Sequence, residues 1–187
     1  MHNKNWQRAL TLALAAAGYG GVSAGASAGA SVELSLPAPQ HIAIDTAPAR
    51  ADTDVRVLAA RRYAAFWNTG DAQFARQALS PSFIDRTLPA GRPQGVDGPL
   101  QASEGFRKAV PDLNAEVQDM TVAGDRVAVH LRFRGHFTGV FGQLQGKGQA
   151  VDFQAHDLYR IQDGRIAENW HLEDNLTLMQ QLGAIPQ

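Results

Sequence analysis

Apolar residues recur with a helical period in the segment that follows residue 52. Such spacing is typical of one face of a helix, and here the stripe consists of Val55, Leu58, Ala59, Tyr63, Phe66 and Trp67. Gly70 stands where a helix-ending glycine is expected, and Asp71 can cap a second, shorter helix through about Leu79. A third helix is predicted from Pro99 to Ala109, because Pro111 disfavours helical conformation just before it.

After Pro111 the period changes from helical to alternating. Val127, Val129, Leu131 and Phe133 share one face, while polar residues occupy the other, as in a half-buried strand. The predicted strands are Ala115–Val122, Asp125–Thr138, Ala150–Gln162 and Arg165–Glu173, and Asp163-Gly164 marks a tight hairpin between the last two. A final helix is predicted over Asn175–Leu182. Helices followed by an antiparallel meander predict an α+β fold.

The first thirty residues have the pattern of an export signal. Lys4 and Arg8 precede the apolar stretch Ala9–Ala17, and small residues then offer several A-x-A cleavage sites. We therefore expect residues 1–30 to be a cleaved signal peptide and the protein to be periplasmic or secreted. Residues 31–51 carry three prolines and little periodicity, which predicts a flexible leader. The folded domain is expected over residues 52–187.

The composition excludes several classes of protein. The 187 residues carry a formal net charge of −1 and no basic block, which argues against a nucleic-acid partner. Beyond the first segment, nothing is long and apolar enough to predict a stable membrane span. Without cysteine, the core must be held by burial alone. The six histidines form no H-E-x-x-H motif, so neither a metal nor another cofactor is expected.

One carboxylate lies on the apolar face of the strand Ala150–Gln162. Asp157 alternates with the apolar and aromatic residues Val151, Phe153, Ala155, Tyr159 and Ile161. Burying a charge without a partner costs several kcal/mol, so Asp157 requires a hydrogen-bonding partner, a raised pKa or a wet cavity. A bond to Tyr159, to a backbone amide or to an arginine within the core is the structural alternative to catalysis.

The hairpin can bring His171 within cross-strand reach of Asp157. A histidine beside a carboxylate is a general base whose pKa lies near working pH. Strict alternation, however, places His171 opposite the face of Ile166 and Trp170. Either a β-bulge re-aims His171, or both faces of the sheet are covered, as in a dimer.

The chain as a whole resembles the SnoaL-like polyketide cyclases, also called ester cyclases, over nearly all of residues 55–186. The matching segments occur in the same order: Ala65-Phe66, Asn68-Thr69-Gly70, Pro111-Asp112-Leu113, Phe137–Gly142, Gly146-Lys147, Asp157–Ile161, Asp163–Glu168, Trp170, Asp174 and Gln181-Leu182-Gly183. The resemblance implies the cone-shaped fold of nuclear transport factor 2-like proteins, with three N-terminal helices over a curved antiparallel sheet. It also implies a homodimer.

Family cyclases close an aromatic polyketide ring by intramolecular aldol condensation, without metal or cofactor. Their catalytic aspartate lies on the last strand and an assisting histidine on the preceding strand. Counted from the shared hairpin turn, these places are taken by His171 and Asp157, so the pair is reversed here. An asparagine that helps in the cyclases falls at Asp85. The reversed pair can still move a proton, with His171 as base and Asp157 orienting it.

These observations favour a cofactor-independent enzyme that performs acid/base chemistry, whether cyclisation, isomerisation or hydrolysis, on a small apolar or cyclic compound. Glu168 or Asp174 is the candidate second acid, although Asp174 can instead cap the last helix. The apolar wall is expected to consist of Phe66, Trp67, Phe137, Phe141, Tyr159 and Trp170. Two alternatives are a non-catalytic binding protein that uses the same pocket and an interaction protein that dimerises through the sheet.

Overall fold

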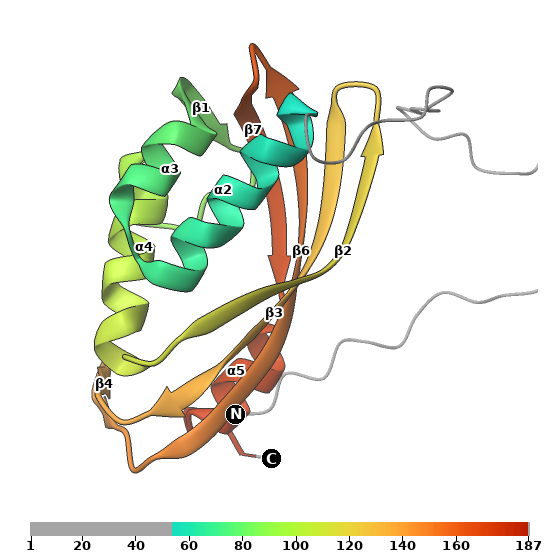
Figure 1. The fold of residues 1–187 in the computed structure, drawn as a ribbon. Coiled ribbons are helices and arrows are strands. Elements are labelled where there is room, and N and C mark those ends of the chain that lie inside the picture. Colours follow the sequence, from blue (N-terminus) through green and yellow to red (C-terminus); the bar gives the residue numbers. More distant parts are fainter. Residues whose placement is uncertain (1–53, 187) are drawn as a thin grey trace, which may run out of the picture. The chain divides into compact units, whose positions relative to one another are not determined.

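The structure is a computed structural model that describes residues 54–186. The predicted signal peptide and leader, residues 1–30 and 31–51, lie outside the described residues. Three helices pack over one face of a curved sheet (Figure 1). They are α2 (Val55–Thr69), α3 (Ala72–Ala78) and α4 (Asp97–Ala109), and α5 (Asn175–Gln181) follows the last strand. The predicted α+β architecture, with three N-terminal helices and a short C-terminal helix, is therefore confirmed.

The main sheet has five strands in the order β1-β7-β6-β3-β2. These are β1 (Leu79–Asp85), β2 (Asn114–Ala123), β3 (Arg126–Phe137), β6 (Gln149–Gln162) and β7 (Arg165–Glu173), while β4 (Val140–Phe141) and β5 (Leu144–Gln145) form a separate pair. The sheet is mixed rather than wholly antiparallel, because β1 runs parallel to β7. Leu79, expected at the end of a helix, instead begins β1, where it pairs with Ile166.

Side-chain caps define three of the helices. Asp54 accepts the Arg56 N–H before α2, and Asp71 accepts the Gln73 N–H at 2.8 Å before α3. Asp174 accepts the Thr177 N–H at 3.0 Å before α5. These bonds satisfy donors that the first helical turn leaves free. Gly70 ends α2 with a φ of 76°, a conformation that glycine adopts without the steric cost of a side chain.

The buried face of α2 differs in its first turn from the predicted stripe. Val55 and Leu58 are 57% and 40% exposed, whereas Ala60, Tyr63 and Ala64 are buried. The contact with the rest of the domain thus begins at the second turn, so the two early apolar residues stay in solvent. None of the helices within residues 54–186 has the length and hydropathy that a membrane span requires.

The inner faces of β3 and β6 form the centre of the core. On β3, Val127, Val129, Leu131 and Phe133 are buried, and on β6 the buried residues alternate from Val151 through Asp157 to Ile161. Because strand side chains alternate between faces, the intervening polar residues lie on the outer face. The alternation predicted for both strands is confirmed, including the buried position of Asp157.

A β-bulge in β7 changes which of its side chains face the core. Ile161 pairs with Ile166, but Arg160 pairs with Glu168, so Ala167 is an extra residue on β7. A regular register through the Asp163-Gly164 hairpin would place Trp170 opposite Asp157. The extra residue shifts the pairing by one position and places His171 opposite Asp157 instead. Of the two alternatives drawn from the sequence, the bulge is the one observed.

Candidate active site

A cavity of about 490 Å³ lies between the helices and the inner face of the sheet. Its apolar wall is largely aromatic and comes from α2, α4, β3, β4 and β6: Trp67, Phe106, Phe133, Phe141 and Phe153. The rings of Phe133 and Phe153 stack with centroids 5.1 Å apart, and Phe106 meets Phe153 edge-on. A cavity of this size and lining suits a small ring compound.

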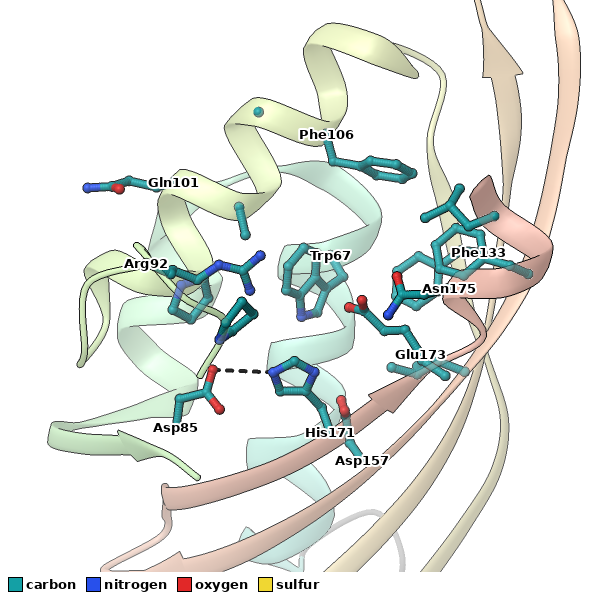
Figure 2. Close-up of a pocket in the computed structure, with 18 of the residues that line it drawn as sticks. Trp67, Asp85, Arg92, Gln101, Phe106, Phe133, Asp157, His171, Glu173 and Asn175 are labelled. Atoms are coloured by element: carbon teal, nitrogen blue, oxygen red, sulfur yellow. Dashed lines mark hydrogen bonds and ion pairs between the residues drawn. The ribbon is translucent and has the colours of Figure 1, made fainter. Parts of the chain in front are cut away.

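Asp85 and His171 meet in this cavity. His171 Nε2 lies 3.3 Å from Asp85 Oδ2, and both side chains are largely buried. Figure 2 shows the two groups facing each other across the junction of β1 and β7. Thr87 holds both residues, because its N–H donates to Asp85 Oδ1 and its hydroxyl accepts the His171 N–H at 3.0 Å. The parallel strand β1 therefore supplies the carboxylate that orients the imidazole.

Asp157 lines the same cavity next to His171 but has a different partner. It accepts a hydrogen bond of 2.6 Å from the Tyr159 hydroxyl. Burial raises the pKa of Asp157 to about 6, although the Tyr159 bond and the charge of His171 act in the opposite direction. Burial also raises the pKa of Tyr159 well above its ordinary value, so its hydroxyl stays a donor. Within residues 54–186, His171 is hydrogen-bonded to Asp85 rather than to Asp157.

Three polar residues of the cavity were not singled out from the sequence. Asn169 and Glu173 flank His171 at spacings of two on β7, so the bulge turns all three inward. Arg92 belongs to the loop after β1 and points into the same space as Glu173 and Trp67 (Figure 2). Strict alternation from Ile166 gave the wrong face for the β7 residues, and the loop offered no pattern that identified Arg92.

Of the predicted wall residues, Trp67 and Phe141 line the cavity. Phe66, Phe137 and Tyr159 are sealed in the core at 1%, 0% and 1% exposure, so they support the wall from behind. Large apolar residues on an inward face can pack against the core or against a ligand, and the sequence pattern is the same for both.

Three other predicted site residues face away from the cavity. Glu168 lies on the outer side of β7, where its carboxylate pairs with Arg86 and Arg160. Asp174 caps α5 through Thr177, which was the structural alternative for this residue. Trp170 also lies on the outer face, under the guanidinium of Arg126 at 5.2 Å. The bulge explains Glu168 and Trp170, because it exchanges the faces of the β7 residues that follow it.

The outer face of the sheet carries a second, shallower hollow beside Trp170 and Leu172. His130 and His156 stack there with ring centroids 4.4 Å apart, and His130 Nε2 bonds to Gln154 at 2.8 Å. Leu172 is 75% exposed beside them. Within the described part of the chain, no cluster of three or more His, Asp or Glu side chains has the geometry of a metal site.

The family model for SnoaL-like polyketide cyclases matches residues 57–182. The chain belongs to this family. The match spans all the described helices and strands from the second turn of α2 to α5, and with them the whole cavity. The fold and the family expected from the sequence are thus both confirmed.

Solved structures give the same assignment. A candidate polyketide cyclase from Bacillus cereus ATCC 10987 is 41% identical, with a TM-score of 0.67, over 81% of this chain and 95% of that one. IdmH, a candidate polyketide cyclase from Streptomyces antibioticus, is 27% identical, with a TM-score of 0.62, over 68% and 98%. AclR, a candidate hydroxylase from Streptomyces galilaeus, is 26% identical, with a TM-score of 0.63, over 71% and 83%. No curated protein matches the chain significantly.

Proposed function

We propose that this protein is a cofactor-independent acid/base enzyme that removes a proton from a carbon next to a carbonyl group in a small ring compound. The observation that carries the proposal is the placement of His171, held by Asp85 at 3.3 Å, within an aromatic-walled cavity. Membership of the SnoaL-like family supports chemistry of the cyclase or isomerase type.

The imidazole of His171 is the general base. When Nε2 carries the proton and donates it to Asp85, Nδ1 is the free acceptor. The Asp85 carboxylate also stabilises the imidazolium that forms when Nδ1 takes the proton. This gives the carboxylate role to Asp85 rather than to Asp157, which the sequence had suggested.

A second proton-transfer group completes acid/base chemistry. Asp157 adjoins His171, and its pKa of about 6 allows it to carry a proton at slightly acidic pH. A protonated carboxyl group can donate to a developing alkoxide or enolate, a role that the ionised carboxylates Glu168 and Asp174 cannot fill from outside the cavity. Asp157 is thus the second catalytic group of the proposal.

The test uses a probe that reports proton removal whatever the natural substrate. 2-Tetralone has an aromatic ring, a ketone and exchangeable hydrogens next to the carbonyl, and NMR in deuterium oxide follows their replacement. The wild-type protein is expected to accelerate the exchange, and H171Q is expected to lower the rate by about 10²–10⁴-fold. H130Q is the matched control, since His130 lies on the outer face. Equal rates in H171Q and the wild type would remove His171 from the mechanism.

A non-catalytic binding protein is the second candidate, favoured by the exchanged positions of the histidine and the aspartate. It predicts that 2-tetralone raises the melting temperature of the wild-type protein while exchange stays at the rate in buffer. Turnover by the wild-type protein that H171Q abolishes decides against this candidate.

We also propose that the protein is exported and works as a homodimer. The pattern of residues 1–30 supports export, and the exposed Leu158 and Leu172 beside Trp170 support pairing through the outer face of the sheet. Export predicts a shortened mature chain outside the cytoplasm, which N-terminal sequencing of the secreted or periplasmic fraction reveals. Light scattering of L172K tests the dimer: the variant is expected to be monomeric while the wild type is dimeric.

A further inference from the structure

Asn169 occupies a position that the proposed proton transfer does not explain. It lies on β7 two residues before His171, and its Cα partners are Asp85 on β1 and Tyr159 on β6. Residues two apart on a strand project from the same face, so Asn169 lines the cavity beside the base. The main chain of Asn169 is satisfied, since its carbonyl accepts the Arg86 N–H at 2.8 Å.

The side chain of Asn169 is not satisfied in the same way. The residue is 3% exposed, and its Oδ1 is buried without any hydrogen-bonding partner. Buried polar atoms in native proteins are nearly always hydrogen-bonded, because a lost bond to water has to be replaced. Among the described residues, Ser103 Oγ and Arg107 Nε share this condition, but neither residue lines the cavity. Asn169 is therefore the unpaired group that a ligand can reach.

We infer that the cavity binds hydroxylated ring compounds and that Asn169 accepts a hydrogen bond from the ligand's hydroxyl group. An unpaired oxygen acceptor calls for a donor, and a carbonyl group alone offers none. The aromatic wall formed by Phe106, Phe133 and Phe153 suits the ring. Arg92 in the same cavity disfavours a cationic donor such as an ammonium group.

This assignment rests on the proposed function only in taking the same cavity as the substrate site. It adds the class of substrate, because it requires an O–H group next to the carbon that His171 addresses. Asn169 then fixes the ring so that the reacting carbon faces the imidazole, and it also discriminates against analogues that lack the hydroxyl. A site built to hydrogen-bond a hydroxyl rejects such analogues because its own polar group is left unpaired.

Four probes with one carbon skeleton separate the possibilities. 2-Tetralol carries a hydroxyl donor, 2-tetralone only an acceptor, tetralin neither, and 2-aminotetralin a cationic donor. Isothermal titration calorimetry of the wild-type protein is expected to show 2-tetralol binding about 3- to 10-fold more tightly than the other three, the range of one net hydrogen bond. Equal binding of 2-tetralol and 2-tetralone, tighter binding of 2-aminotetralin, or no binding of 2-tetralol would overturn the inference.

Two variants complete the test. N169L is expected to lose the preference for 2-tetralol, and it should raise the melting temperature of the free protein because an unpaired buried polar atom is removed. N175L, altered at another cavity residue, is the matched control and should keep the preference. If N169L does not fold, N169A makes the same comparison of binding. A preference that survives both substitutions of Asn169 would contradict its role.

These measurements stand apart from the exchange assay. H171Q should lose deuterium exchange and keep the preference for 2-tetralol, since it leaves Asn169 unchanged. Loss of the preference in H171Q alone would show that the base rather than Asn169 binds the hydroxyl. Failure of the proposed function and failure of this inference therefore give different results.

Discussion

The buried carboxyl group of Asp157 makes a quantitative prediction about stability. Burial raises its pKa from 3.8 to about 6, and a pKa that rises on folding means that the ionised form destabilises the folded protein. At 1.36 kcal/mol for each pH unit, the difference corresponds to roughly 3 kcal/mol once Asp157 is fully ionised. That is a large share of the stability of a typical domain.

The substitution D157N removes the charge and keeps an acceptor for the Tyr159 hydroxyl. Below about pH 4 the carboxyl group is protonated in both states, so wild type and variant should be about equally stable. As the pH rises from about 4 to about 6, the folded wild type loses stability that the variant keeps, and above that range the difference is constant. D157N is therefore expected to exceed the wild type by up to roughly 3 kcal/mol at pH 8.

Urea denaturation at pH 4, 6 and 8 measures this difference. D152N is the control of opposite sign, because the pKa of Asp152 is lowered, chiefly by its bond to Arg132. It should lose stability relative to the wild type at pH 8 and recover as the pH falls. A D157N variant that is less stable than the wild type at pH 8, or whose difference is the same at pH 4 and 8, would refute the reasoning.

Three further substitutions test other parts of the account. D85N should lower the exchange rate of 2-tetralone about tenfold or more and shift the His171 tautomer, read from imidazole ¹⁵N chemical shifts, because Nε2 loses its carboxylate partner; an unchanged rate would contradict this. E168Q should cost about 1–2 kcal/mol in urea denaturation, because it weakens the contacts with Arg86 and Arg160; it should leave exchange unaffected, and a lost exchange activity would place Glu168 in the mechanism. G70A should cost about 1 kcal/mol in the same assay, since Gly70 has a φ of 76°; an equally stable variant would show that the αL cap is unimportant.

Local patterns in the sequence carried most of the fold. The helical stripe of α2, the alternation of β3 and β6 and the Asp163-Gly164 turn are properties of neighbouring residues, and each appears in the structure as expected. Strand β1 was missed because its sequence contains serines and a proline and shows no clean alternation. It becomes a strand by pairing with β7, more than eighty residues later, which is a tertiary effect.

The candidate site depended on one such tertiary detail. Asp157 was identified because a carboxylate on an apolar strand face needs an explanation, and it does line the cavity. The direction of His171 turned on a single extra residue, Ala167, which no local signal announces. The same bulge hid Asn169 and Glu173 and made Glu168 and Trp170 look like inward-facing groups. Asp85 was known only from the family resemblance, and its role as the partner of His171 came from the parallel pairing of β1.

The central claim is that His171, oriented by Asp85, takes a proton from a ring compound inside the aromatic cavity. A crystal structure of the protein with bound 2-tetralone tests it most directly. The account predicts the ketone in the cavity, its ring against Phe133 and its exchangeable carbon within about 3.5 Å of His171 Nδ1, with Nε2 still facing Asp85. A ketone bound on the outer face beside Trp170, or an imidazole turned away from the bound ketone, would contradict it.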